Sequence, residues 1–284
     1  VIVIVISIMD SKNNSIIEPE TTNVTGVQFS IMSPEEIRGK SVVEIEKHDT
    51  YEKDVPVVKG LFDIRMGTTD MDKTCGTCLQ DHINCPGHFG HIELAKPVFH
   101  YQFITMIQKI LKCTCIQCSK LLINKESPQI KNLVDKPNKV RWEHIYEMSS
   151  KINRCGQEND EGCGARQPTK LKLDSMSGIF AIWDKLGDQE STQKLTAENI
   201  KSIFEKMTDE DIQLLGFSEH WCRPEWLICT VLGIPPPAVR PSVKQDDSQR
   251  MDDDITHKLC DIVKSNNTLK HKIASNSRIE IIDD

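Results

Sequence analysis

The sequence is poor in aromatic residues and contains no long apolar segment. Aromatic residues make up 5% and hydrophobic residues 38% of its 284 residues, so each of the two domains that this length predicts has a thin core. The most apolar stretch, residues 1–8, is far shorter than the ~20 residues of a membrane-spanning helix. No basic residue precedes it and no cleavage site follows it, so it is not a signal peptide. We interpret it as sequence upstream of a start at Met9, with an edge strand as the alternative.

The sequence also lacks an excess of basic residues and the common phosphate-binding and nucleophile motifs. With 35 Lys+Arg against 42 Asp+Glu, the net charge of -7 argues against a general polyanion-binding protein but allows a local basic groove. No G-x-x-x-x-G-K-[ST], G-x-G-x-x-G or G-x-S-x-G motif is present. The acidic residues 252–254 lack the turn glycines of a cation-binding loop and are typical of a helix N-terminus. The residue pattern therefore shows no catalytic centre.

Cysteine is the residue type that the sequence has in excess, with eleven copies concentrated in a few segments. The first predicted zinc site has the spacing C-x2-C-x6-C-x2-H and consists of Cys75, Cys78, Cys85 and His88. A two-residue spacer lets one tight turn deliver two ligands, and Gly76 and Gly87 allow the backbone turns that this requires. The rival ligands His82 and His91 do not keep that spacing, so we interpret them as histidines at the surface or beside the ligands and not as ligands themselves.

A second predicted zinc site is split along the chain. Its four ligands are Cys115, Cys118, Cys155 and Cys163. Cys113 is either a spare thiol or a misassigned ligand. Four protein ligands leave no position for a catalytic water, so both sites are predicted to be structural and to replace missing core. The three isolated cysteines are expected to be free and buried, namely Cys222, Cys229 and Cys260.

Hydrophobic periodicity predicts a mixed set of short elements. Alternation predicts a strand over residues 27–31, and the 3.6-residue period with capping residues predicts helices starting near 34, over 99–112, 142–152, 196–207 and 208–215, and from about 255. No hydrophobic period is found over 60–92. Residues 156–170 are glycine-rich and residues 244–254 are polar, so both are predicted to be loops. The predicted fold class is α+β, an irregular zinc-stabilised arrangement of short helices, small β elements and long loops.

Longer motifs resemble the N-terminal part of the largest subunit of multi-subunit DNA-directed RNA polymerases, of the eukaryotic, archaeal or large-DNA-virus type. The similar segments are VQFSIMSPEEI (27–37), GLFDIRMG (60–67), CPGHFGHIELAKPVFH (85–100), GCGARQPT (162–169) and RPEWLICTVLGIPPPAVRPSV (223–243). The resemblance covers roughly residues 24–275. It departs at Ile64, where the family usually has proline.

The resemblance implies a clamp, the mobile jaw that closes over DNA. By position it implies a flexible lead-in (1–23), a clamp core with the first zinc site (24–114), the second zinc site and clamp head (115–222), a return to the clamp core with the lid loop (223–252), and a truncated first arm of the clamp coiled coil (253–284). In the lid region, Arg240, Lys244 and Arg250 are candidate nucleic-acid contacts, and Lys170 and Lys172 are further candidate phosphate contacts.

The implied function is DNA retention, RNA/DNA strand separation and factor docking during transcription. The implied partners are the second-largest subunit, the rest of the largest subunit, template DNA, nascent RNA, and initiation and elongation factors, with no membrane. The family's Asn-Ala-Asp-Phe-Asp-Gly-Asp motif, which binds catalytic Mg²⁺, has no match here. We therefore expect a nucleotidyltransferase component that is inactive alone, carries two structural Zn²⁺, and has Mg²⁺ only in the complete enzyme.

The implied location is the nucleus in a eukaryotic cell, or a viral factory or virion for a large DNA virus. Two other hypotheses are a stand-alone zinc-binding module that binds nucleic acid or protein, and a redox-switched thiol protein. Zinc content separates the redox hypothesis from the others, because a bound zinc ion blocks the thiols that a redox switch needs. Co-purification with a second-largest polymerase subunit separates the polymerase segment from the stand-alone module.

Overall fold

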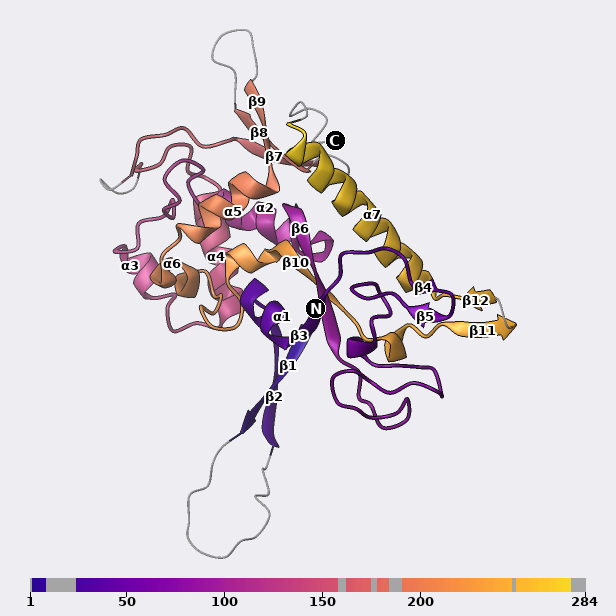
Figure 1. Ribbon diagram of the computed structural model, residues 1–284. Coiled ribbons are helices and arrows are strands. Elements are labelled where there is room, and N and C mark those ends of the chain that lie inside the picture. The colour runs from indigo at the N-terminus through magenta and orange to yellow at the C-terminus, as the bar shows by residue number, and fades with distance from the viewer. Residues whose placement is uncertain are drawn as a thin grey trace, which may run out of the picture. The chain divides into compact units, whose positions relative to one another are not determined.

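The computed structural model describes residues 2–8, 24–157, 162–174, 178–183, 191–246 and 249–276 (Figure 1). It is a mixture of short helices and small sheets, which confirms the predicted α+β class. The chain divides into two compact units, each made from two separate stretches of sequence. Unit 1 consists of Val1–Ser33 and Phe99–Ile228, and unit 2 of Pro34–Val98 and Cys229–Asp284. Among the described helices, none combines the length and apolar character needed to cross a membrane.

Unit 1 combines helices with two antiparallel sheets. Its helices are α2 (Ile104–Cys113), α3 (Pro128–Lys131), α4 (Asn138–Ser149), α5 (Ala197–Glu205) and α6 (Asp209–Leu214), with 3-10 turns η2 (Tyr101–Phe103) and η3 (Pro224–Leu227). Its two-stranded sheet pairs β1 (Ile2–Ile8) with β2 (Val24–Ile31). Its three-stranded sheet has the order β7 (Lys170–Asp174), β8 (Gly178–Trp183), β9 (Ser191–Leu195).

Local signals in the sequence explain where several unit 1 elements start. The Thr196 hydroxyl accepts a hydrogen bond from the Asn199 N–H at the start of α5, and the Thr208 hydroxyl accepts one from the Asp211 N–H at the start of α6. Gly216, with φ of 88°, ends α6 as expected. The strand over 27–31 is confirmed within β2. Residues 2–8 form β1, the strand alternative, whereas residues 9–23 of the expected flexible lead-in lie outside the described residues.

Unit 2 is built around a small sheet and one long helix. The three-stranded sheet has the order β10 (Ile228–Ile234), β6 (Phe89–Phe99), β3 (Ser41–Glu44), and its β3 and β6 strands are parallel. Two short antiparallel pairs join β4 (Tyr51–Glu52) to β5 (Val55–Pro56) and β11 (Val243–Asp246) to β12 (Gln249–Met251). The helical elements are α1 (Pro34–Lys40), η1 (Ile64–Met66), η4 (Pro237–Val239) and α7 (Asp254–Ala274).

Two features of unit 2 differ from the sequence expectations. Leu61, Phe62 and Met66 are buried in its core, although the stretch 60–92 shows no hydrophobic period. The Asp63 carboxylate explains this local order, because it accepts hydrogen bonds from the Lys59 and Arg65 N–H groups and so fixes a turn that directs the apolar residues inward. The predicted polar loop over 244–254 instead contains β11, β12 and the first residue of α7.

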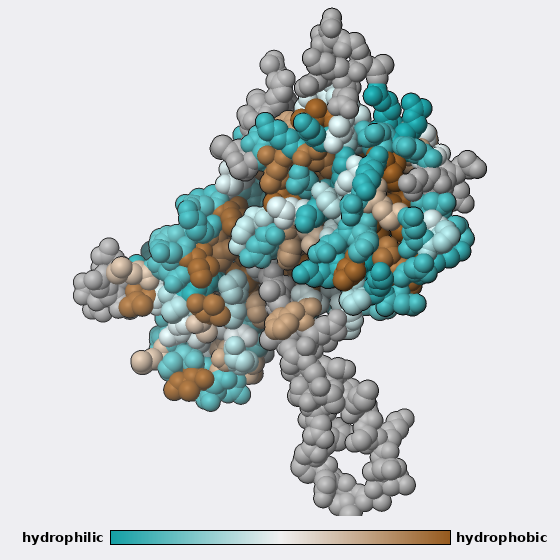
Figure 2. All heavy atoms as spheres, turned by 180° about the vertical axis from the view of Figure 1, so that it is seen from behind, coloured by the Kyte–Doolittle hydropathy of each residue, from teal (hydrophilic) through white to brown (hydrophobic). Residues whose placement is uncertain are grey.

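The two units have separate hydrophobic cores. In unit 1, helices α2 and α5 and the inner face of the β7–β9 sheet bury Ile107, Ile179 and Phe204 completely. In unit 2, Ile92 of β6 and Ile234 of β10 pack with Val263 of α7. The face drawn in Figure 2 is a mosaic of hydrophilic side chains with smaller hydrophobic patches between them. The core of unit 2, with nine buried hydrophobic residues in the described part of the chain, is the smaller of the two.

Candidate metal centres

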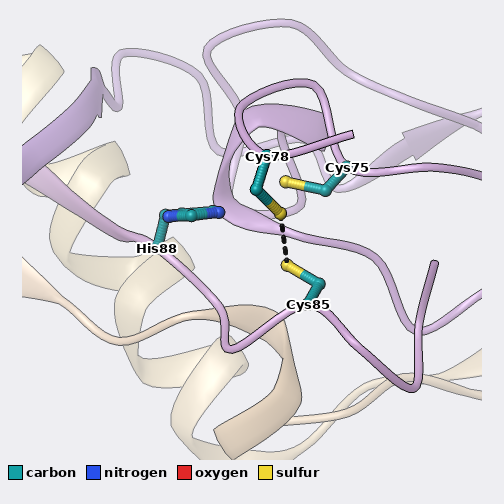
Figure 3. Close-up of side chains that lie close together, drawn as sticks. All are labelled: Cys75, Cys78, Cys85 and His88. Atoms are coloured by element: carbon teal, nitrogen blue, oxygen red, sulfur yellow. Dashed lines mark hydrogen bonds between the residues drawn. The ribbon is translucent and has the colours of Figure 1, made fainter. Parts of the chain in front are cut away.

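The first cysteine cluster lies in unit 2, in the loop between η1 and β6. One ligand atom from each of its members lies within 4.8 Å of the others, and these members are Cys75, Cys78, Cys85 and His88. Figure 3 shows the three sulfur atoms gathered at one point with the His88 ring directed toward them. The Cys78 and Cys85 sulfur atoms are 3.6 Å apart. The spacing pattern in the sequence thus corresponds to one compact group in space.

A tight turn presents the first two thiols of this cluster. The Cys75 N–H donates to the Gln80 carbonyl (2.8 Å), and the Leu79 N–H donates back to the Cys75 carbonyl (3.0 Å). Leu79 closes the turn with φ of 60°, a left-handed conformation that is uncommon for a leucine. The Thr77 N–H points at the Cys75 sulfur (3.4 Å). Gly76 is expected from the sequence to allow the backbone turn, but it does not adopt a positive φ. Leu79 is the residue of this turn that does.

The second half of the first cluster depends on Gly87, as expected from the sequence. Gly87 has φ of 79°, and its N–H donates to the Cys85 sulfur at 3.4 Å. A Cβ atom at this position would lie 2.7 Å from Cβ of Pro236. Only glycine therefore fits here without displacement of the Pro236 ring.

The second cluster lies in unit 1 and repeats the same turn. Its four sulfur atoms lie within 4.8 Å of one another and belong to Cys115, Cys118, Cys155 and Cys163. The Cys115 N–H donates to the Lys120 carbonyl (2.8 Å), the Ser119 N–H donates to the Cys115 carbonyl (2.9 Å), and Ser119 has φ of 64°. These values match those of the turn that starts at Cys75. The backbone thus builds the same cysteine-presenting turn twice from different residues.

A short antiparallel ribbon brings the other two thiols to this turn. The Cys155 N–H donates to the Ala165 carbonyl (2.9 Å), and Arg154 pairs with Arg166 as an isolated bridge. Gly156 and Gly164, which follow Cys155 and Cys163, adopt positive φ values of 81° and 74°. The Cys115–Cys163 and Cys118–Cys155 sulfur distances are both 3.6 Å. A glycine with positive φ therefore follows each of these two cysteines directly in the chain.

Gln167 is a member of the second site that sequence reasoning missed. Its side chain is 6% exposed, and its amide nitrogen donates to the Cys115 sulfur and to the Ala165 carbonyl, both at 3.1 Å. Its amide oxygen accepts from the Ile116 N–H at 3.3 Å. The sequence signal that could have identified Gln167 is its position in the motif GCGARQPT, four residues after the ligand Cys163. The buried amide orients a thiol in the manner of an outer-shell ligand.

The arrangement of donor atoms fits tetrahedral zinc at both clusters. Zinc–sulfur bonds of about 2.3 Å in a tetrahedron place two sulfur atoms about 3.8 Å apart. The observed 3.6 Å separations are close to this value. The buried Nε2 atom of His88 has no hydrogen-bond partner, so its lone pair is available to a cation. Each cluster could therefore hold a metal ion, and its four side chains leave no open position for water.

Burial and hydrogen bonds from peptide N–H groups shift the thiol pKa values in both clusters. Burial would raise the pKa of the Cys75 thiol, but N–H groups of Cys78 and Thr77 donate to its sulfur and lower it overall. Burial would likewise raise the pKa of the Cys118 thiol, but the Lys120 N–H donates to its sulfur and the pKa is lowered overall. Burial raises the pKa of Cys85 to about 11. Peptide N–H groups therefore favour one thiolate in each cluster, and a bound cation would favour the rest.

The other cysteines and histidines lie outside both clusters. Burial raises the pKa of Cys113 to about 12, which favours a protonated thiol rather than a ligand. Cys113 is fully buried, and Cys222, Cys229 and Cys260 are partly buried. The His91 Nδ1 atom lies 2.7 Å from the Ser41 hydroxyl, and His82 is absent from the described clusters. Neither histidine belongs to a described cluster, which agrees with the interpretation from their spacing that they are not ligands.

The Arg240 side chain lies in the interior of unit 2 and not on a surface that a nucleic acid could contact. Its side chain is 0% exposed, and its guanidinium donates to the Pro235 carbonyl (3.1 Å), the Thr256 hydroxyl (3.4 Å) and the Leu61 carbonyl. Burial lowers its pKa to about 10, so it stays charged at neutral pH. The expectation of a phosphate contact is therefore wrong for Arg240. The side chain instead holds together three segments of unit 2.

Arg250 also has partners within unit 2. Two guanidinium nitrogens donate to the two carboxylate oxygens of Asp70 (3.0 and 3.2 Å), and a third lies 3.3 Å from Asp54. The side chain is 14% exposed. These contacts favour an anchoring role over a free phosphate contact. Lys244 pairs with Arg250 across β11 and β12, and its side chain lies outside the described part of the chain.

Comparison with known proteins gives one consistent result. A family model described as RNA polymerase Rpb1, domain 1, matches residues 21–284. A protein from Euplotoides octocarinatus, described as DNA-directed RNA polymerase II subunit RPB1, is 37% identical over 267 residues, which cover 90% of this chain and 55% of that relative. The chain thus spans about half the length of the curated relative that it matches.

Proposed function

The chain belongs to the RNA polymerase Rpb1 domain 1 family, the N-terminal region of the largest polymerase subunit, and from this we propose that it is a zinc-stabilised clamp and lid segment. In this role it retains DNA, helps to separate RNA from DNA and docks transcription factors. It contributes to nucleotidyl transfer as part of the enzyme and is inactive alone. Its Mg²⁺-dependent chemistry, subunit partners and nucleic acids belong to the complete polymerase, which in a eukaryote works in the nucleus.

The observation that carries this proposal is the repeated cysteine turn. Two clusters, one in each unit, present four ligands within 4.8 Å, within a sequence that matches the family model over residues 21–284. Zinc bound at these clusters would supply cross-links between loops that have little core of their own. A closed four-ligand site performs no hydrolysis, so its contribution is structural. The shape of the clamp surface would then depend on zinc.

Two structural features support the lid and factor-docking parts of the proposal. The paired strands β11 and β12 lie within residues 243–251, the segment that resembles the lid. Helix α7 resembles the first arm of the clamp coiled coil, and it buries Leu259 and Val263 against unit 2 while Ile255 and Ile262 stay exposed. Exposed apolar residues seven apart on one helix suit a second helix or a protein factor.

Metal content is the first test. We expect two zinc ions per full-length chain by mass spectrometry of the purified protein. His88→Ala should lose one zinc, whereas His91→Ala, three residues away, should retain both. Cys118→Ser should lose the other zinc, whereas Cys113→Ser should retain both. A chain without zinc, or matched variants that lose equal amounts, would overturn the zinc assignment.

Assembly is the second test. The chain should co-purify with a second-largest polymerase subunit when both are expressed together, and the zinc-deficient variants should do so less well. A zinc-loaded chain that never associates with polymerase subunits would favour the stand-alone module instead. A chain whose thiols titrate freely in the native state would favour the redox hypothesis.

A further inference from the structure

The three-stranded sheet β7–β8–β9 of unit 1 has one buried and one outward face. Leu171, Leu173, Ile179, Ala181 and Leu195 lie on the inner face, where the last three are at most 2% exposed. Their neighbours along each strand therefore point to the opposite side, because side chains alternate along a strand. That outer face has a composition unlike the rest of the acidic chain.

The outer face carries three lysines around an aromatic ring. The strand register places Lys172, Phe180 and Lys194 in one row across the sheet, and Lys170, Ile182 and Thr192 in the next row. Cβ atoms of directly opposed residues lie about 4.5–5.5 Å apart, so both lysines of the first row flank the Phe180 ring. We call the face formed by these six residues the lysine face.

The charges of the lysine face have no counter-ions within the described chain. Lys170, Lys172 and Lys194 are exposed, and their side chains form no ion pair or hydrogen bond with another described residue. The Asp174 carboxylate lies beyond the lysine face on β7, opposite Gly178. Three unpaired positive charges in one patch contrast with the net charge of -7 for the chain. Such a patch has charge complementarity to a polyanion.

The aromatic ring narrows the choice of polyanion. Phe180 and Ile182 are only partly exposed, and neither belongs to the described hydrophobic cores nor packs against them. An aromatic ring on a sheet, flanked by basic side chains, is a platform on which an unpaired base stacks while lysines contact the adjoining phosphates. A duplex keeps its bases stacked internally and would use only the lysines.

We propose that the lysine face binds single-stranded nucleic acid, with Phe180 stacking on a base and Lys172 and Lys194 contacting phosphates on either side. This inference deepens the proposed function, on which it rests for its biological setting, because it assigns a particular surface of unit 1 to nucleic-acid contact. Because Arg240 is buried, that lid-region arginine cannot contact nucleic acid, and another basic surface of the chain has to provide the contact.

Fluorescence anisotropy with a labelled dT20 oligonucleotide tests the proposal on the full, zinc-loaded chain. The double variant Lys172→Glu/Lys194→Glu should bind at least about tenfold more weakly, and its slope of log K against log salt should fall by about 1.4, at about 0.7 per lost phosphate contact. The matched control Lys139→Glu/Lys206→Glu changes the same net charge at two exposed positions of the same unit, one in α4 and one directly after α5, and should bind as the unchanged chain does. Equal weakening in both double variants would overturn the proposal.

Phe180→Leu tests stacking separately, because leucine preserves an apolar side chain on the sheet. Affinity for dT20 should fall by about 5- to 100-fold without a change in salt slope. Unchanged circular dichroism and zinc content verify that each variant is folded. The single-strand assignment would be overturned if the chain bound a 20-base-pair duplex as tightly as dT20 and Phe180→Leu left the affinity for dT20 unchanged. Binding of poly-glutamate but not dT20 would overturn the nucleic-acid assignment.

Failure of this inference can be distinguished from failure of the proposed function. A chain that binds dT20 through the lysine face but never assembles with polymerase subunits supports the inference and contradicts the proposed function. A chain that assembles into polymerase but whose lysine-face variants bind dT20 normally supports the proposed function and contradicts the inference.

Discussion

Arg240 and Arg250 lie over two neighbouring aromatic rings of unit 2, those of Phe62 and Tyr51. The Arg240 guanidinium carbon is 5.0 Å from the Phe62 ring centroid, and that of Arg250 is 4.0 Å from the Tyr51 centroid. The two rings are 5.1 Å apart. Because Arg240 precedes β11 and Arg250 belongs to β12, these contacts attach both ends of the β11–β12 hairpin to the segment 51–62.

The ion pair between Arg250 and Asp70 should contribute measurably to this attachment. Both side chains are 14% exposed and the contact is bidentate. A double-mutant cycle of Arg250→Gln and Asp70→Asn should give a coupling energy of about 1–2 kcal/mol in the free energy of unfolding, measured with urea. The exposed pair Lys151–Glu147 should give less than about 0.5 kcal/mol. A coupling no larger than that of the exposed pair would contradict the anchoring role.

Asp63 should make the stability of unit 2 depend on acid pH. Its side chain is 2% exposed; burial would raise its pKa, but hydrogen bonds from the Arg65 side chain and from the Lys59 and Arg65 N–H groups lower the pKa overall. A native pKa below the unfolded value of about 3.9 stabilises the fold at higher pH, and this stabilisation is lost as pH falls through the native pKa.

Asp63→Asn should therefore lower the free energy of unfolding by about 1–3 kcal/mol at pH 7. The difference between the two proteins should persist down to about pH 4 and shrink at lower pH. Measurement of both proteins over the same pH series cancels the effect of acid on the zinc sites. The exposed Asp72→Asn should change the free energy by less than about 0.5 kcal/mol throughout. A pH-independent difference for Asp63→Asn would contradict a charge-based role.

Some elements were predictable because short-range chemistry alone specifies them. Thr196 and Thr208 cap their helices through their own hydroxyl groups, and the two-residue spacers of the cysteine pairs determine the reach of each turn. The helix predicted over 99–112 is confirmed as α2 with a later start, since residues 101–103 form η2. In these cases the signal lies within about four residues.

Other features were not predictable because distant residues decide them. Strand β6 is only partly buried along most of its length and contains Pro97, so it shows neither a clean alternation nor an apolar run. Arginine is usually exposed, and the interior suits Arg240 because the fold brings together the Leu61 and Pro235 carbonyls and the Thr256 hydroxyl as acceptors. The left-handed Leu79 is set by hydrogen bonds of its turn, not by its residue type.

Gly87 should be sensitive to the smallest possible substitution. Its φ of 79° disfavours any side chain, and an added Cβ would meet two atoms of Pro236 at 2.7 and 2.8 Å. Gly87→Ala should lower the free energy of unfolding by about 2–4 kcal/mol and weaken zinc binding at the first cluster. Gly39, in α1, has open space around the corresponding position. Gly39→Ala should be neutral or stabilise by up to about 1 kcal/mol, and an equal loss in both variants would contradict the steric argument.

Gln167 should control zinc retention at the second cluster without being a ligand. Loss of its N–H donor to the Cys115 sulfur should make the thiolate less well oriented and less stable. Gln167→Ala should therefore weaken zinc binding there by about 10- to 100-fold, measured by competition with a chromophoric chelator, and leave the first cluster unchanged. Gln167→Glu should be at least as damaging, because it replaces the donor with a negative charge beside the thiolates. Gln157 is the matched control, because its exposed side chain accepts a hydrogen bond from the Asn153 N–H near the same cluster without touching a sulfur. If Gln157→Ala released zinc as readily as Gln167→Ala, the effect would arise from the ribbon as a whole and not from the hydrogen bond to Cys115.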